Sequence, residues 1–167
     1  MWIMEGKMLP SPVEVPHARR RTQRGFTLIE LITVVTIVAI LAAIATPYFR
    51  DFILGQRIRA AGYEIVSALI YARSEAIKRN SGVTVAAATG GWQNGWTVTS
   101  GAITLSQHEA LQGLTMTGPV AGLVYNGNGR LAATISPFGI SAANSSAPQR
   151  CINVDLSGLP SSQAGSC

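Results

Sequence analysis

Charged residues are scarce in this chain of 167 residues, since they make up 13% of the sequence against about 25% in ordinary soluble domains. Apolar residues make up 47%. Disordered chains and acidic tails are rich in charge and poor in apolar residues, so this composition excludes both classes. The apolar excess is concentrated in residues 26–45, which carry one formal charge. That concentration indicates a membrane segment.

Histidine and cysteine are also scarce, with two residues of each in the chain. His108 is the one histidine outside the first 25 residues, and it is expected to form an exposed turn pair with Glu109. No nucleophile, base and orienting group, and no pair of carboxylates, can be assembled from the C-terminal half. Trp92 and Trp96 are expected to serve packing. The sequence therefore predicts no enzyme, no cofactor and no metal site.

The net charge of +5 is not evenly distributed. Residues 1–25 have a net charge of +3, residues 26–79 have +2, and residues 80–167 have two basic and two acidic side chains. The basic character of the chain therefore says little about the partners of its C-terminal part, and gives no strong indication of nucleic-acid binding.

Shifts in composition divide the chain into four segments. They are a basic, proline-containing leader (1–25), a transmembrane helix (26–46), an amphipathic continuation of that helix (47–80) and a β-rich head (81–167). As a helix, residues 26–45 would extend about 30 Å, which is enough to cross the bilayer core. The arginines that precede them predict a cytoplasmic N-terminus and a periplasmic head, with the inner membrane between.

The amphipathic continuation has the period of a helix. Pro47 is expected to bend the helix without ending it, because the helical pattern resumes at once. One apolar stripe recurs at spacings of three and four residues: Ile58, Ala61, Ile65, Ala68, Ala72 and Ala76. Asn80, Ser81 and Gly82 supply a stop signal.

Short apolar and threonine-rich runs follow Gly82, separated by turn residues. The strand candidates are residues 83–88, 96–99, 103–105, 114–117, 131–135 and 152–156. Asn94–Gly95 predicts a two-residue hairpin, residues 126–129 predict a second turn, and residues 141–149 a mobile loop. The expected fold class is α+β, with one long N-terminal helix packed against a small antiparallel β-sheet head.

The segment Arg24–Leu31 resembles the class III signal of type IV pilins and type II secretion pseudopilins. It has a basic leader, a glycine, a phenylalanine and then an apolar helix with glutamate at its fifth position. The resemblance implies that a prepilin peptidase cleaves between Gly25 and Phe26 and methylates the new N-terminus of Phe26. Pro47 lies where this family has its helix-kinking proline.

Glu30 is expected to need a partner on physical grounds that are independent of the resemblance. A carboxylate within hydrocarbon costs on the order of 3 kcal/mol on insertion scales, so a partner is expected. The amine of Phe26, freed by cleavage, is a suitable partner within the same chain or in a neighbouring subunit of a filament. The alternative is that Glu30 lies at headgroup depth and is solvated there.

Two other interpretations of the N-terminus are open. An ordinary secretory signal could be cut after Ala43–Ile44–Ala45, which would release a protein that begins at Thr46. Glu30 and the length of the apolar run oppose this, because such signals have apolar regions of about 7–15 residues. The third interpretation is a membrane anchor that is neither processed nor assembled.

The two cysteines, Cys151 and Cys167, both lie in the outward-facing part, where an oxidising periplasm favours a disulfide. The bond would close a loop of about sixteen residues and contribute about 3 kcal/mol on the chain-entropy model. A metal site is the alternative, but two cysteines with one histidine nearby are too few ligands.

The head most resembles the FimT/GspH group of pilin-like proteins. The residues that carry this resemblance are Tyr71–Ala76, Gly82–Val85, Trp92–Trp96, Arg150–Ile152, Ser157–Gly158 and Cys167. The C-terminal ones match FimT better than GspH. The resemblance implies a minor pilin that takes part in assembling a type IV pilus by lateral packing of its N-terminal helix, with prepilin peptidase, other pilins and inner-membrane lipid as partners.

Two further functions stay open. The first is a GspH-like minor pseudopilin of type II secretion, which would use the same kind of N-terminal helix. A DNA-binding subunit for natural transformation is the second alternative, because some FimT relatives are thought to bind DNA through arginines after the glycine of the C-terminal motif. Here no arginine follows Gly158, and Arg130 and Arg150 are the remaining candidates. DNA is therefore not expected as a partner.

Overall fold

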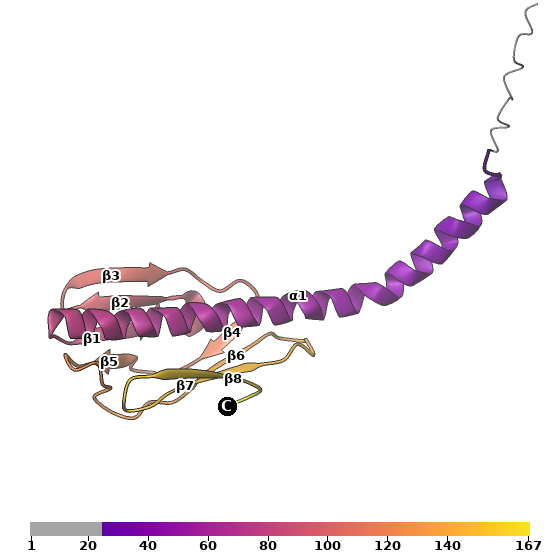
Figure 1. Ribbon diagram of the computed structural model, residues 1–167. Coiled ribbons are helices and arrows are strands. Elements are labelled where there is room, and N and C mark those ends of the chain that lie inside the picture. The colour runs from indigo at the N-terminus through magenta and orange to yellow at the C-terminus, as the bar shows by residue number, and fades with distance from the viewer. Residues whose placement is uncertain (1–24) are drawn as a thin grey trace, which may run out of the picture. The chain divides into compact units, whose positions relative to one another are not determined.

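The computed structural model describes residues 25–167, so the leader lies outside the described residues except for Gly25. The chain divides into two units, one ending at Ile40 and the other running from Leu41 to Cys167. Helix α1 (Leu28–Arg79) contributes to both, and eight strands belong to the second unit (Figure 1). This is the expected α+β fold, with one long N-terminal helix and an antiparallel head.

α1 contains both helical segments that the sequence predicts, as a single helix of 52 residues. The backbone remains helical through position 47, so the proline there does not end the helix. A bend at Pro47 stays a prediction. Among the described residues, α1 is the one helix that is long and apolar enough to cross a membrane.

α1 ends where the stop signal predicts. Asn80 has φ 47°, in the left-handed region. The N–H of Asn80 donates to the carbonyl of Ile77 at 3.2 Å, and that of Ser81 donates to the carbonyl of Ala76 at 3.2 Å. This pair of bonds is a Schellman motif, which satisfies carbonyls left free at the helix end.

The apolar stripe of α1 forms one wall of the core. Five of the six predicted stripe residues are buried together with Leu69: Ile58, Ala61, Ile65, Ala72 and Ala76. Ala68 is only partly buried and packs against this core. The predicted helix face is otherwise confirmed.

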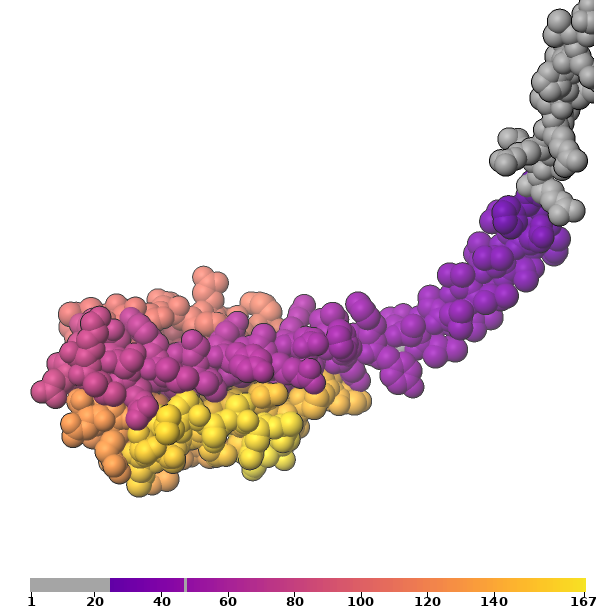
Figure 2. All heavy atoms as spheres, viewed as in Figure 1, coloured from indigo at the N-terminus to yellow at the C-terminus, as the bar shows by residue number. Residues whose placement is uncertain are grey.

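The head contains two antiparallel sheets of four strands each. The first has the order β3-β2-β1-β5 and the second β4-β6-β7-β8. Their bounds are β1 (Val83–Ala87), β2 (Trp96–Ser100), β3 (Ile103–His108), β4 (Thr115–Thr117), β5 (Leu123–Tyr125), β6 (Phe138–Ser141), β7 (Arg150–Val154) and β8 (Pro160–Ala164). In Figure 1 the first sheet passes from β2 and β3 on one side of the second half of α1 to β5 on the other side, where the second sheet also lies; Figure 2 gives the same view with all atoms.

Three strands were not predicted from the sequence: β5, β6 and β8. β5 and β6 are only three and four residues long, and β8 consists of small and polar residues with low strand propensity. These three segments are strands because their backbones pair with neighbouring strands, and the local sequence does not show such pairing. The predicted strand at residues 131–135 is wrong, because only Leu131 forms a bridge there, to Tyr125.

The predicted two-residue hairpin at Asn94–Gly95 is also wrong in length. β1 and β2 do pair, with Ala87 opposite Trp96, but residues 88–95 all belong to the connection. It contains a 3₁₀ turn, η1 (Trp92–Asn94), which places the Trp92 ring in the core, edge-on to Phe138 with ring centroids 4.8 Å apart. The free energy gained by burying the Trp92 ring outweighs the local preference for a two-residue turn.

The second predicted turn is confirmed. The N–H of Gly129 donates to the carbonyl of Asn126 at 2.8 Å. The side-chain oxygen of Asn126 accepts hydrogen bonds from the N–H groups of Asn128 and Arg130, each at 3.0 Å. Asparagine thus holds the turn through its own side chain, as is typical of this residue in turns.

Candidate functional site

The N-terminus of α1 is closed by a reciprocal pair of side-chain bonds. The carboxylate of Glu30 accepts from the backbone N–H of Thr27 at 2.9 Å and from its hydroxyl at 2.8 Å. The N–H of Glu30 approaches the Thr27 hydroxyl oxygen at 3.3 Å. This is a capping box, and the spacing Thr-x-x-Glu is its signal in the sequence. The expectation for Glu30 rested on its charge and missed this signal.

The structure therefore supplies Glu30 with a partner other than the expected one. In this uncleaved chain the nitrogen of Phe26 is an amide bonded to Gly25, so a pair between Glu30 and a free amine stays a prediction. A Cβ added at Gly25 would meet no described atom within 4 Å other than those of its chain neighbours, and cleavage between Gly25 and Phe26 stays a prediction.

Beyond the cap, α1 presents apolar side chains on all sides. Every described residue from Leu28 to Thr46 is exposed, including Leu28, Ile32, Val35 and Leu41. The three threonines of this stretch do not disturb it, since their hydroxyls donate to carbonyls four residues earlier. A helix that is apolar all round requires lipid or other helices around it.

The outward face of the second half of α1 is also partly apolar. Tyr63, Ile70 and Ile77 recur every seven residues and are exposed, with Ser67 and Ser74 exposed between them. Residues spaced in this way lie on one side of a helix, and small residues between large ones allow close approach of a second helix. This face is a candidate packing surface.

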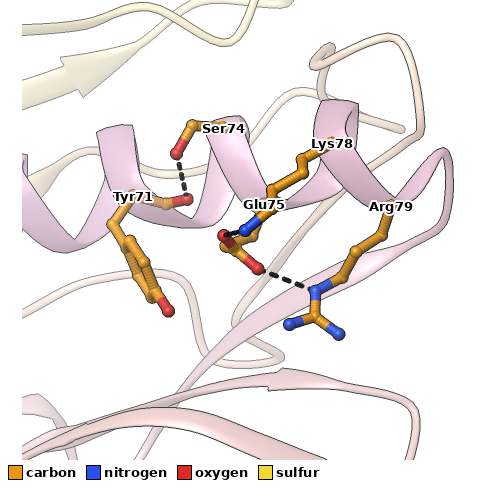
Figure 3. Close-up of polar contacts among 5 residues, drawn as sticks. All are labelled: Tyr71, Ser74, Glu75, Lys78 and Arg79. Carbon is orange, nitrogen blue, oxygen red and sulfur yellow. Dashed lines mark hydrogen bonds and ion pairs between the residues drawn. The ribbon is translucent and has the colours of Figure 1, made fainter.

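Polar contacts near the end of α1 hold an acidic side chain in place (Figure 3). Glu75 is buried, and its carboxylate accepts from Nε of Arg79 at 2.7 Å and from Nζ of Lys78 at 3.3 Å. The hydrogen bond from Arg79, followed by that from Lys78, holds the pKa of Glu75 below its ordinary value against the effect of desolvation. The cluster is a structural support, since both cations are already used.

His108 is not in the exposed turn that the sequence predicts. It ends β3, its ring stacks on Trp96 with centroids 4.1 Å apart, and its Nε2 lies 3.2 Å from a carboxylate oxygen of Glu64 on α1. The expected pair with Glu109 is limited to a contact between Nδ1 of His108 and the Glu109 carbonyl at 2.8 Å. His108 thus links a strand to the helix, a contact that needs the tertiary fold.

The predicted disulfide is present between Cys151 and Cys167, with Cα atoms 5.1 Å apart. Cys151 is buried on β7, whereas Cys167 follows β8. β8 pairs with β7 over five residues, so the bond fastens a C-terminal hairpin to the core of the second sheet.

The two candidate DNA contacts lie in different parts of the head. The Arg150 side chain lies beside the Tyr63 ring, 5.9 Å from its centroid, and donates to Ser162 at 2.9 Å. Arg130 follows the turn that accepts a hydrogen bond from Arg73 at the Gly129 carbonyl, 3.0 Å away. Tyr63 and Arg73 are about 15 Å apart along α1, so the structure does not bring the two candidates together.

Two carboxylates of the unit Leu41–Cys167 are held by serine hydroxyls. Asp51 on α1 accepts from Ser145 at 2.8 Å, and this bond, with further bonds from Ser146, lowers the pKa of Asp51. Asp155 accepts from the hydroxyl and the N–H of Ser157, which lower the pKa of Asp155. Both groups fix loops. Among the described residues no three His, Cys, Asp or Glu side chains gather in a possible metal site.

Comparisons with known proteins agree with this architecture. The family model for type II transport protein GspH matches residues 61–158, and that for the prokaryotic N-terminal methylation motif matches residues 20–46. No curated protein matches the chain at a significant level.

Two crystal structures of the type IV minor pilin FimU from Pseudomonas aeruginosa strain PAO1 have a similar fold. The one in space group P65 has a TM-score of 0.56 at 23% identity and covers 65% of this chain and 98% of its own. The one in space group P21 has a TM-score of 0.59 at 24% identity and covers 67% and 96%. At these identities the likeness shows the fold.

The methylation motif and the family together imply processing by a prepilin peptidase and association with other pilins. With the apolar N-terminal helix, they indicate a membrane-anchored protein that enters a pilus-like filament. The chain belongs to the GspH family of type IV pilin-like proteins, as a minor pilin or pseudopilin.

Proposed function

We propose that this protein is a FimT-like minor pilin that helps to assemble a type IV pilus and has no catalytic activity of its own. The observation that carries the proposal is the all-round exposure of apolar side chains from Leu28 to Ile44 next to a closed, well-packed head. Such a helix is stable in a membrane, and equally stable when surrounded by the apolar helices of other subunits.

Assembly uses the two surfaces of α1 in turn. Residues 26–46 hold the chain in the inner membrane, with a cytoplasmic leader and a periplasmic head, until the filament takes it up. The exposed side chains Tyr63, Ile70 and Ile77 then pack against a helix of a neighbouring subunit. Glu30, near the start of α1, pairs with a Phe26 amine after the leader is removed.

The choice of a pilus over a secretion pseudopilus has support from the C-terminal part of the chain. Its last strand is fastened by Cys151 and Cys167, which matches the FimT-like order of residues better than the GspH-like one. The solved structures of similar fold are described as minor pilins. A GspH-like role in type II secretion is the alternative.

Deletion of the gene in its own host tests the proposal. We expect surface pili, counted by electron microscopy, to fall in number, while secretion of extracellular enzymes stays normal. Wild-type protein should restore piliation, and the matched variant Gly25→Val, which keeps the head but resists processing, should not. Normal piliation together with lost secretion would establish the alternative.

A further inference from the structure

An open hollow of about 530 Å³ lies between α1 and the loop that joins β6 to β7. The helix lines it with Ala43, Thr46, Arg50 and Asp51, and the loop lines it with residues 144–146. All of these residues belong to the unit Leu41–Cys167. We call this feature the Arg50 hollow.

Along α1, the Arg50 hollow extends from the end of the apolar run to the outer edge of the lipid headgroup layer. Ala43 belongs to the apolar run that is expected to end at the membrane surface, and Arg50 follows the last residue of that run, Ala45, by about 8 Å of helix. The headgroup layer adds about 5–7 Å to each side of the hydrocarbon core. Three exposed aromatic side chains, Tyr48, Phe49 and Phe52, surround the same level, as is typical of the membrane interface.

The loop that closes the hollow is anchored to the helix. The Ser145 hydroxyl donates to Asp51 at 2.8 Å, and the N–H of Ala147 donates back to the Ser145 oxygen at 2.9 Å. Farther along, a Cβ at Gly55 would lie 3.7 Å from Cδ of Pro148, so the loop follows the helix closely. In Figure 1 it extends along α1 past the ends of the strands. The loop that borders the hollow is thus bonded to the helix, and its mobility stays a prediction.

The hollow offers one cation and one anion side by side. Within residues 25–167 no hydrogen bond or ion pair engages the guanidinium of Arg50 or the side-chain amide of Asn144, both of which are exposed. Asp51 is already bonded to serine, but a carboxylate has about four acceptor positions, so it retains capacity. Thr46 contributes no donor, because its hydroxyl donates to the carbonyl of Ala42 at 2.7 Å.

A phosphate alone would be repelled by Asp51 and a cation alone by Arg50. A zwitterion that carries a phosphate and a primary ammonium a few ångströms apart satisfies both side chains at once. Guanidinium binds phosphate through two parallel hydrogen bonds, and a primary ammonium has three donors for carboxylate and amide oxygens. A quaternary ammonium has no N–H to donate.

We propose that the Arg50 hollow binds the headgroup of an ethanolamine phospholipid, with its phosphate on Arg50 and its ammonium on Asp51. The proposal rests on the membrane topology given under Proposed function. Bound in this way, a lipid of the periplasmic leaflet fixes the depth and the rotation of the head at the membrane before the subunit enters a filament.

Lipid binding to the full chain in detergent tests this. Native mass spectrometry counts retained molecules of phosphatidylethanolamine, phosphatidylcholine and phosphatidylglycerol over a concentration series. We expect phosphatidylethanolamine to bind about tenfold more tightly than either other lipid, because each of the others lacks one charge-assisted contact. Equal retention of all three lipids would overturn the proposal.

Three variants locate the site. Arg50→Gln should weaken phosphatidylethanolamine binding about tenfold, whereas Arg57→Gln, a matched change of an exposed arginine two turns along α1, should leave it unchanged. Asp51→Asn should remove the preference over phosphatidylglycerol. Asp51→Asn could also free the loop, which faster hydrogen exchange in residues 141–149 would show. In that case Arg50→Gln alone tests the location of the binding site, since Arg50 does not anchor the loop. Wild-type binding by Arg50→Gln would contradict the assignment.

Soluble phosphoethanolamine distinguishes the source of the headgroup. We expect it to bind at least tenfold more weakly than the lipid, because it lacks the acyl chains that the apolar helix contacts. Binding of equal strength would mean that a free metabolite, and not a membrane lipid, occupies the hollow. Lipid binding is measured on the purified chain without a pilus, and pilus assembly is measured in the deletion strain without purified lipid. The lipid proposal and the proposed function can therefore fail independently.

Discussion

Thr27 and Glu30 cap the long helix reciprocally, since the Glu30 carboxylate accepts from both the N–H and the hydroxyl of Thr27, at 2.9 and 2.8 Å. One residue before Thr27 is Phe26, whose nitrogen becomes a charged amine if the leader is removed. The acidic side chain therefore lies beside the predicted new N-terminus before any cleavage. We predict that this carboxylate also pairs with that amine during assembly.

Two substitutions of Glu30 separate these roles. Glu30→Gln keeps an acceptor for the Thr27 N–H, because glutamine also serves in a capping box, but it removes the charge that an amine would pair with. Glu30→Val removes both. We expect each variant to insert into the membrane as well as wild type or better, and each to fail in piliation.

The measurement is complementation of the deletion strain, scored by counting pili, with membrane fractionation as the control for insertion. If Glu30→Gln assembles normally while Glu30→Val does not, the cap alone is important and the ion pair is unnecessary. Full complementation by Glu30→Val would remove any role for this side chain.

Processing at Gly25 is the second prediction. Coexpression with a prepilin peptidase should give a mature chain that starts at N-methylated Phe26, as intact-mass spectrometry and N-terminal sequencing would show. Gly25→Val should block cleavage, since a branched side chain crowds the scissile bond, while the smaller Gly25→Ala should be affected less. A mature chain that begins at Thr46 would instead establish an ordinary secretory signal.

Because a Cβ at Gly25 would meet no described atom within 4 Å other than those of its chain neighbours, we expect neither variant to disturb the head. Unchanged circular dichroism of the two proteins is the control for this point.

The disulfide should stabilise the head. Cys167→Ser is expected to lower the free energy of unfolding by about 3 kcal/mol, because the open chain gains conformational entropy when a loop of sixteen residues is no longer closed. Urea unfolding followed by tryptophan fluorescence measures the change, and Ser166→Ala is the matched control. A reductant should destabilise wild type by a similar amount and leave Cys167→Ser unaffected.

Tyr125 should titrate unusually late. Its ring is fully buried and its hydroxyl donates to the Gly158 carbonyl at 3.3 Å. Burial, chiefly, raises the pKa of Tyr125 from 10.0 to about 12. Because the pKa of the folded state is the higher one, the stabilisation is complete below pH 10. As the pH rises from 10 to about 12, the free energy of unfolding falls by about 3 kcal/mol in total.

Absorbance of tyrosinate at 295 nm measures this titration. We expect a late ionisation step near pH 12 that vanishes in Tyr125→Phe. Tyr71→Phe, at an exposed position, is the control and should leave this late step unchanged. Absence of a late step in the wild-type protein would contradict the burial of the Tyr125 hydroxyl.

DNA binding should be weak. A fragment of residues 54–167 is expected to bind duplex DNA weakly or not at all at about 0.15 M salt, where non-specific dissociation constants are about 10⁻⁴–10⁻⁶ M. Residues 80–167 contribute two separated arginines and two acidic residues. Residues 54–79 add five basic and two acidic residues, but most of these lie on a helix that is expected to pack against neighbouring subunits. Arg130→Gln with Arg150→Gln should therefore change little in fluorescence anisotropy. Micromolar affinity that collapses in this double variant would make DNA uptake the leading function.

The sequence alone determined the features that depend on neighbours along the chain. The apolar run at 26–45, the stripe that contains Ile58, Ile65 and Ala72, and the stop at Asn80 all appear in the structure where the sequence predicts them. Helical hydrogen bonds link residues four apart, so periodicity and local breakers are sufficient to define a helix.

Only the tertiary structure decided the features that depend on distant segments. β8 is a strand because β7 pairs with it, although its own residues disfavour one. His108 contacts Glu64 across 44 positions, and Ser145 contacts Asp51 across 94. The Arg50 hollow exists because a loop late in the chain returns to the helix. No local pattern encodes such a return, because it results from packing between elements that are far apart in sequence.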